Sequence, residues 1–108
     1  MAAGFKDRET GYEARYQRDQ ETLFKITARR NRLLGLWAAE IMGVSGDAAE
    51  RYGAEVVASD FEEVGDADVM RKVLRDINRK GAPIDEQALR KQLEVFGETA
   101  RQQIEGEV

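Results

Sequence analysis

The chain has 108 residues and a formal net charge of -4, with 42% hydrophobic and 35% charged residues. This length suffices for one domain around one modest core, and no apolar run is long enough to cross a bilayer. The sequence contains no cysteine and no histidine, which excludes disulfides, zinc fingers, cysteine nucleophiles and histidine bases. We therefore expect a protein that is not an enzyme, with no catalytic and no metal site.

Residues 1–22 differ in composition from the rest of the chain. After Met1, the large apolar side chains of this segment and the first large apolar side chain of the body fall within about 40° of one another on a helical wheel. These positions are Phe5, Tyr12, Tyr16 and Leu23. Gly4 and Gly11 each cost a helix roughly 1 kcal/mol, so we predict a mobile, partly helical N-terminal arm that orders on a partner. The alternative is that the stripe continues the first helix of the body and packs on the bundle.

Charge also separates the N-terminal region from the body. Residues 1–32 hold eight Lys/Arg against five Asp/Glu, whereas residues 33–108 hold nine against sixteen. This asymmetry indicates an arm with a role of its own, or else a plain solvated face. The first nine residues carry four charges and no apolar stretch, so we expect no signal peptide and a cytoplasmic protein.

The remaining residues, 23–108, show the helical periodicity of four segments joined by short connections. The first covers 23–42, the second runs to Gly65, the third ends before Gly81, and the last follows Pro83. Capping residues and terminal glycines mark the ends of these segments. They are Gly43, Ser45, Gly65, Asp66, Gly81 and Asp85. The pattern predicts an all-α protein, a compact four-helix bundle over 23–108 with the arm over 1–22.

Each predicted helix carries an apolar stripe at spacings of three and four residues. The stripes are Leu33, Leu34, Leu36, Trp37 and Ile41; Ala49, Tyr52, Val56, Val57 and Phe61; Val69, Met70, Val73, Leu74 and Ile77; and Leu89, Leu93, Phe96, Ala100 and Ile104. Val64 with Met70 and Ile84 with Leu89 have the spacing of hydrophobic staples at the starts of the third and fourth helices. These residues are the expected core.

Two charged segments raise the question of a ligand. The acidic stretch 60–68 resembles a calcium loop, but Val64 and Arg71 stand where two of the ligands are required. A basic cluster consists of Lys25, Arg29, Arg30 and Arg32. No aromatic residue lies between these cations and no Walker motif is present, so we expect no nucleic-acid binding. A weak ATP or ADP site at these four residues stays open as an alternative.

Two longer stretches closely resemble the zeta-subunit family of ATPase inhibitors from alphaproteobacteria. They are residues 28–43 (ARRNRLLGLWAAEIMG) and residues 52–73 (YGAEVVASDFEEVGDADVMRKV). The upstream pattern of Asp7-Arg8-Glu9, Tyr12-Glu13 and Tyr16 fits the same family. The resemblance covers nearly the whole chain, and the C-terminal helix is its least distinctive part.

The resemblance implies a regulatory subunit of the F-type ATP synthase. In the family the arm enters a catalytic interface between the alpha and beta subunits, becomes helical, contacts the gamma rotor and blocks rotation in the hydrolysis direction. Phe5, Tyr12, Tyr16 and Leu23 would then be apolar anchors. The flanking polar contacts would be Arg8, Glu9, Glu13 and Arg15. The protein would be monomeric when free and peripheral to the inner membrane when bound, with no direct membrane insertion.

The family pattern leads us to expect alanine at position 11, and this chain has Gly11 there instead. Ordering the arm on its partner costs more with glycine, so the departure predicts weaker inhibition. The alternative function is a small helical adenine-nucleotide-binding regulatory domain with weak or no inhibitory activity.

Overall fold

The computed structural model describes the backbone of residues 2–60 and 65–107 and the side chains of residues 18–60 and 65–107. Its helices are α1 (Ala2–Ile41), α2 (Gly46–Ala58), α3 (Ala67–Arg79) and α4 (Glu86–Glu107). No strand occurs in these described ranges. The predicted all-α fold with four helices is confirmed.

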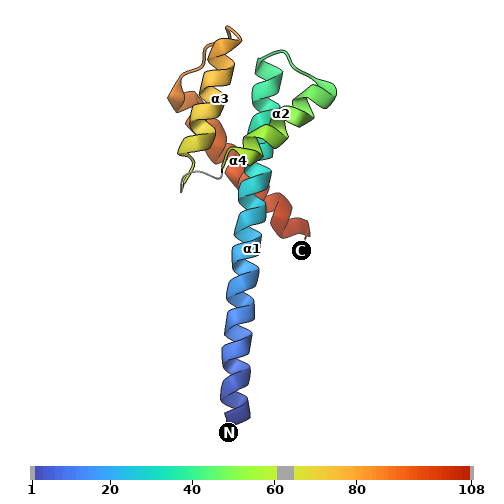
Figure 1. Cartoon of the computed structure of the whole chain (residues 1–108), viewed down its shortest axis with the longest axis vertical. Coiled ribbons are helices and arrows are strands. Elements are labelled where there is room, and N and C mark those ends of the chain that lie inside the picture. Colours follow the sequence, from blue (N-terminus) through green and yellow to red (C-terminus); the bar gives the residue numbers. More distant parts are fainter. Residues whose placement is uncertain (1, 61–64, 108) are drawn as a thin grey trace.

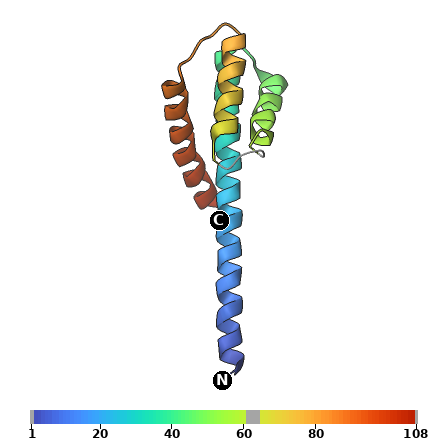
Figure 2. The same ribbon diagram turned by 60° about the vertical axis from the view of Figure 1, so that its left-hand side comes forward.

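Helix α1 has 40 residues and joins the predicted arm to the body without a break. Its N-terminal half projects beyond the other three helices, as two views of the ribbon show (Figures 1 and 2). The only proline is Pro83, so no residue of α1 removes a backbone donor from the helix. The arm therefore continues the first core helix, as the alternative predicted, but it extends away from the bundle. The boundary at residue 22 and the mobility of the arm stay predictions.

The core lies where α2, α3 and α4 surround the C-terminal half of α1. Fully buried apolar side chains come from all four helices: Leu34, Ala38, Val56, Val69, Val73, Ile77 and Leu89. Trp37 of α1 packs edge-on against Phe96 of α4, with ring centroids 6.3 Å apart. The apolar stripes read from the sequence thus meet in one cluster, which is the main source of stability in a helical bundle.

Several predicted helix ends are confirmed. Gly43 and Gly81 have φ angles of 76° and 77° after α1 and α3, a conformation that glycine adopts without a steric penalty. The Asp85 carboxylate accepts a hydrogen bond of 2.7 Å from the backbone N–H of Ala88 at the start of α4. Asp66 occupies the N-cap position of α3 without a capping bond, and its carboxylate pairs instead with Arg90 at 3.6 Å.

Two expectations about the second and first helices are wrong. Helix α2 ends at Ala58 rather than near Gly65. At this end the Ser59 hydroxyl donates a hydrogen bond to the carbonyl of Val56, and the Asp60 carboxylate accepts one from Asn31 of α1. Ile41 is 37% exposed because its neighbour Met42 packs against the core instead. The expected core roles of Phe61 and Val64 lie outside the described residues.

Candidate functional site

The point where α1 leaves the body carries two exposed apolar side chains. Leu23 is 56% and Phe24 is 64% exposed. They point about 100° apart on the helix. Phe24 lines a small cavity of 140 Å³ with Val57 and Asp60 at the end of α2, whereas Leu23 continues the stripe of the arm. Sequence reasoning singled out Leu23 as an anchor and missed Phe24.

The other predicted anchors and polar contacts lie on the projecting half of α1. They are Phe5, Arg8, Glu9, Tyr12, Glu13, Arg15 and Tyr16, and their side chains lie outside the described residues. The continuous helix places positions 5, 12, 16 and 23 along one side, over about 27 Å of helix. The four positions of the stripe therefore lie on one continuous, projecting half of α1, which we call the rod.

One contact at the base of this rod joins α1 to the last turn of α4. The Arg29 guanidinium donates a hydrogen bond of 2.9 Å to Oε1 of Gln103 and forms an ion pair of 3.1 Å with Glu107. Carboxylates at a helix C-terminus are disfavoured by the macrodipole, so a cation beside Glu107 stabilises that end. Arg29 therefore holds the end of α4 on α1.

A second contact at the same level joins α1 to the end of α2. Asn31 is only 1% exposed, and its Nδ2 donates a hydrogen bond of 2.9 Å to Oδ2 of Asp60. Its Oδ1 accepts a bond of 3.0 Å from Nε of Arg30. Arg30 also pairs with Asp60 at 3.9 Å, so the three side chains form one connected polar group.

The four residues of the predicted basic cluster do not converge on one point. Lys25 is exposed, Arg29 and Arg30 are held as described above, and Arg32 pairs with Glu50 of α2 at 2.8 Å. Three of the four cations thus already have carboxylate partners on other parts of the body. Nucleotide binding at these residues stays a prediction.

A different basic cleft was not identified from the sequence. It has a volume of about 530 Å³, and Tyr52 of α2 faces Lys72 and Asp76 of α3 inside it. The Tyr52 hydroxyl donates a hydrogen bond of 2.9 Å to Oδ2 of Asp76, and Lys72 Nζ donates one of 3.0 Å to the same oxygen. Lys72 Nζ also lies 5.3 Å from the centre of the Tyr52 ring. Three further cations line the cleft: Arg51, Arg79 and Lys80.

Comparison with known proteins identifies the family. A family model described as ATPase inhibitor subunit zeta matches residues 1–103. The chain belongs to the ATPase inhibitor subunit zeta family. A structure solved in solution by NMR is 49% identical, with a TM-score of 0.70, and the match covers 79% of this chain and 96% of that one. The comparison with curated protein sequences gave no match. The family assignment drawn from residues 28–43 and 52–73 is confirmed.

The polar pair in the cleft of this zeta subunit has shifted ionisation. Burial, followed by the hydrogen bond to the Asp76 carboxylate, raises the pKa of the Tyr52 hydroxyl. Burial would also raise the pKa of Asp76, but the hydrogen bonds from Lys72 and Tyr52 outweigh it and lower that pKa. The pair therefore consists of a neutral tyrosine and an ionised aspartate at neutral pH, which is a structural bond rather than a proton-transfer site.

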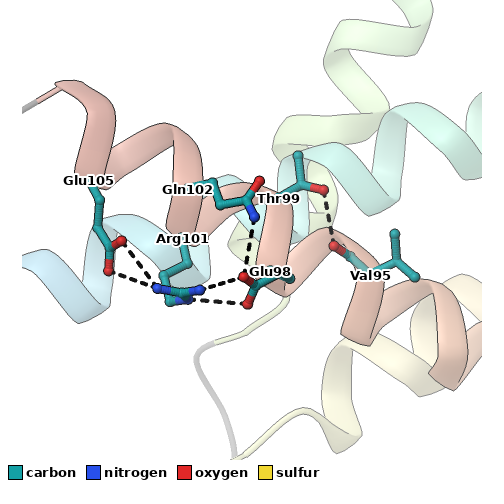
Figure 3. Close-up of polar contacts among 6 residues, drawn as sticks. All are labelled: Val95, Glu98, Thr99, Arg101, Gln102 and Glu105. Atoms are coloured by element: carbon teal, nitrogen blue, oxygen red, sulfur yellow. Dashed lines mark hydrogen bonds and ion pairs between the residues drawn. The ribbon is translucent and has the colours of Figure 1, made fainter.

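The outer face of α4 in the zeta subunit carries a chain of exposed ion pairs (Figure 3). Arg101 binds Glu98 one turn before it and Glu105 one turn after it, and Gln102 also donates to Glu98. The Arg101 hydrogen bond lowers the pKa of Glu98. Exposed pairs of this kind stabilise a helix only slightly, so we assign them to α4 itself and to no ligand.

Among the described residues of the zeta subunit, no group of three or more acidic side chains is arranged to hold a metal ion. Residues 61–64 of the acidic stretch 60–68 lie outside the described residues. Within the same limits, no helix combines the length and apolar character that a membrane crossing requires.

Proposed function

We propose that this zeta subunit inhibits ATP hydrolysis by the F-type ATP synthase through insertion of the N-terminal half of α1. The observation that carries the proposal is that α1 projects from the body as one continuous helix (Figure 1). Its exposed residue Leu23 ends a stripe of large apolar positions. Exposed apolar side chains in such a row are typical of an interface with another protein.

The partners of the arm would be the alpha and beta subunits at a catalytic interface, with the gamma rotor beyond them. Phe5, Tyr12, Tyr16 and Leu23 would insert as anchors. Arg8, Glu9, Glu13 and Arg15 would make the surrounding polar contacts. The body would remain outside the interface. The unbound protein would be a monomer, and the bound protein would be attached to the membrane only through the synthase.

Site-specific cross-linking tests this placement. The chain has no cysteine, so Thr10→Cys introduces a single attachment point for a photoreactive benzophenone on the arm. Irradiation of the complex with the purified cognate head is expected to join the arm to alpha or beta. The matched probe at the exposed position Gln87, on the far side of the body, is expected to give no such product. Products from position 87 alone would overturn the proposed mode of binding.

The Tyr52 cleft supports a second function, the binding of an adenine nucleotide. Its cations Arg51, Arg79 and Lys80 suit the phosphate groups of the nucleotide. An NMR titration of the full chain with ATP or ADP tests it. Saturable shifts around Tyr52 would support the cleft, shifts around Arg29 and Arg30 would support the basic cluster, and no shifts would exclude both.

A further inference from the structure

The base of the arm is held from two sides within a single turn of α1. Arg29 contacts the last turn of α4, whereas Arg30 and Asn31 contact Asp60 just beyond α2. Successive residues of a helix point about 100° apart, so these side chains leave α1 in three different directions. We call Arg29, Arg30 and Asn31 the collar.

The buried member of the collar imposes a particular orientation on α1. Asn31 is 1% exposed, and both polar groups of its side chain are used, one toward Asp60 and one toward Arg30. A buried amide that loses its partners is strongly disfavoured, and hydrogen bonds require specific distances and angles. Apolar packing tolerates small rotations of a helix more readily. The Asn31 bonds therefore select one rotation of α1 relative to α2.

The side chain of Arg30 extends this constraint to α4. Its methylene stem passes over Gly97, where an added β-carbon would lie 3.6 Å from Cδ of Arg30. The guanidinium then reaches Asp60 at the end of α2. On another side of α1, Arg29 binds Glu107 in the last turn of α4. The ends of both neighbouring helices are thus fastened to the same turn of α1.

We propose that the collar positions the arm by fixing the direction in which α1 leaves the body. The helix continues for 27 residues before Arg29, or about 40 Å, so a tilt of about 10° at the collar moves its end by about 7 Å. Arg29, Arg30 and Asn31 are positioning residues that need not touch the partner. The benefit of a fixed direction rests on the proposed inhibitory function, whereas the direction itself is measurable on the free protein.

Distances between two spin labels measure that direction. Gln20→Cys and Ala54→Cys place labels on exposed positions of α1 and α2, on either side of the collar, and no native cysteine interferes. In the otherwise unchanged full chain we expect a narrow distance distribution. Asn31→Ala and Asp60→Ala, each introduced singly, are expected to broaden the distance distribution and to shift its mean. Asp60→Asn, which keeps an oxygen acceptor for Asn31, is expected to restore most of the narrow distribution.

Arg101→Ala is the matched control. It removes the ion pairs with Glu98 and Glu105 on α4 but leaves the collar intact. The distance distribution between the two labels should therefore not change. If Asn31→Ala fails to fold by circular dichroism, Asp60→Ala, at the rim of the body, decides the question. A wild-type distribution in a folded Asp60→Ala variant would overturn the proposal.

Inhibition assays on the same variants separate this inference from the proposed function. Weakened inhibition by Asp60→Ala, with recovery in Asp60→Asn, is the expected outcome. If the unsubstituted chain does not inhibit the head although the label distances respond, the proposed function fails and the positioning role stands. If it inhibits although the distances do not respond, the positioning role fails alone.

Discussion

Gly35 of α1 and Gly53 of α2 lie where the two helices cross, and a β-carbon built on Gly35 would be only 2.7 Å from Cα of Gly53. This close approach of two backbones brings the neighbouring polar groups together. Asn31 lies one turn before Gly35 on α1, and Asp60 lies just beyond the end of α2, the helix that contains Gly53. The Asn31–Asp60 hydrogen bond of 2.9 Å joins α1 to the end of α2 beside this glycine contact.

Replacement of Gly35 by alanine is expected to destabilise the body. Alanine favours a helix over glycine by about 1 kcal/mol, but the new methyl group meets backbone atoms that cannot move aside without separating α1 from α2. Overpacking of a core costs about 1–3 kcal/mol. After the gain of about 1 kcal/mol from alanine is subtracted, we expect a net loss of up to about 2 kcal/mol in the free energy of unfolding. Urea denaturation measures it.

Gly106→Ala is the control for this experiment, because a β-carbon there meets open space. It should leave the stability unchanged or raise it slightly. Equal stability of Gly35→Ala and the unsubstituted chain would show that separating the two helices costs no more than the helix propensity that alanine adds.

The Tyr52–Asp76 bond predicts a specific dependence of stability on pH. The lowered pKa of Asp76 contributes stability that is complete above about pH 4 and is lost as the pH falls through the folded-state pKa. The raised pKa of Tyr52 contributes stability that is complete below about pH 10 and is lost at higher pH. Between these limits the pair contributes a constant amount.

Tyr52→Phe tests this bond directly. We expect a loss of about 1 kcal/mol near pH 7, because Asp76 loses a donor, together with a weaker decline of stability above pH 10. Chemical denaturation at several pH values gives both quantities. A stability curve identical to that of the unsubstituted chain would show that the hydroxyl contributes nothing.

Substitutions of Gly11 and Tyr12 in the arm are expected to have opposite effects on inhibition. If the arm is helical when bound, Gly11→Ala lowers the ordering cost by roughly 1 kcal/mol and tightens inhibition roughly fivefold. Tyr12→Ala removes an anchor, and truncation of a buried aromatic side chain commonly costs ~2 kcal/mol or more. Inhibition constants on one preparation of the ATPase head measure both. Unchanged or weaker inhibition by Gly11→Ala would indicate that position 11 is not helical in the complex.

The sequence predicted those features that follow from local periodicity. The buried residues Leu34, Val73 and Leu93 recur at helical spacing with their neighbours, so the helices and most of the core were identified from the pattern. Family membership followed from the dense run of residues 28–43, and the match over residues 1–103 confirms it.

Long-range polar pairs were not predicted, because a pattern along one helix does not name a partner on another. Asn31 and Asp60 are 29 residues apart, and Tyr52 and Asp76 are 24 apart. Asn31 looked like part of a basic segment, yet it is the buried centre of the collar. The early end of α2 was missed for the same reason, since Asp60 leaves the helical path to reach α1.

Removal of residues 1–18 separates the proposed inhibitory role of the N-terminal half of α1 from the role of the body that holds it. The melting temperature of the shortened chain and its effect on ATP hydrolysis by the purified cognate head should be measured together with those of the full chain. We expect inhibition by the full chain, loss of inhibition by the shortened chain, and nearly equal melting temperatures, because the core lies C-terminal to the deletion. Full inhibition by the shortened chain would show that the arm is not the inhibitory element, and a melting temperature lower by many degrees would show that the arm is part of the core.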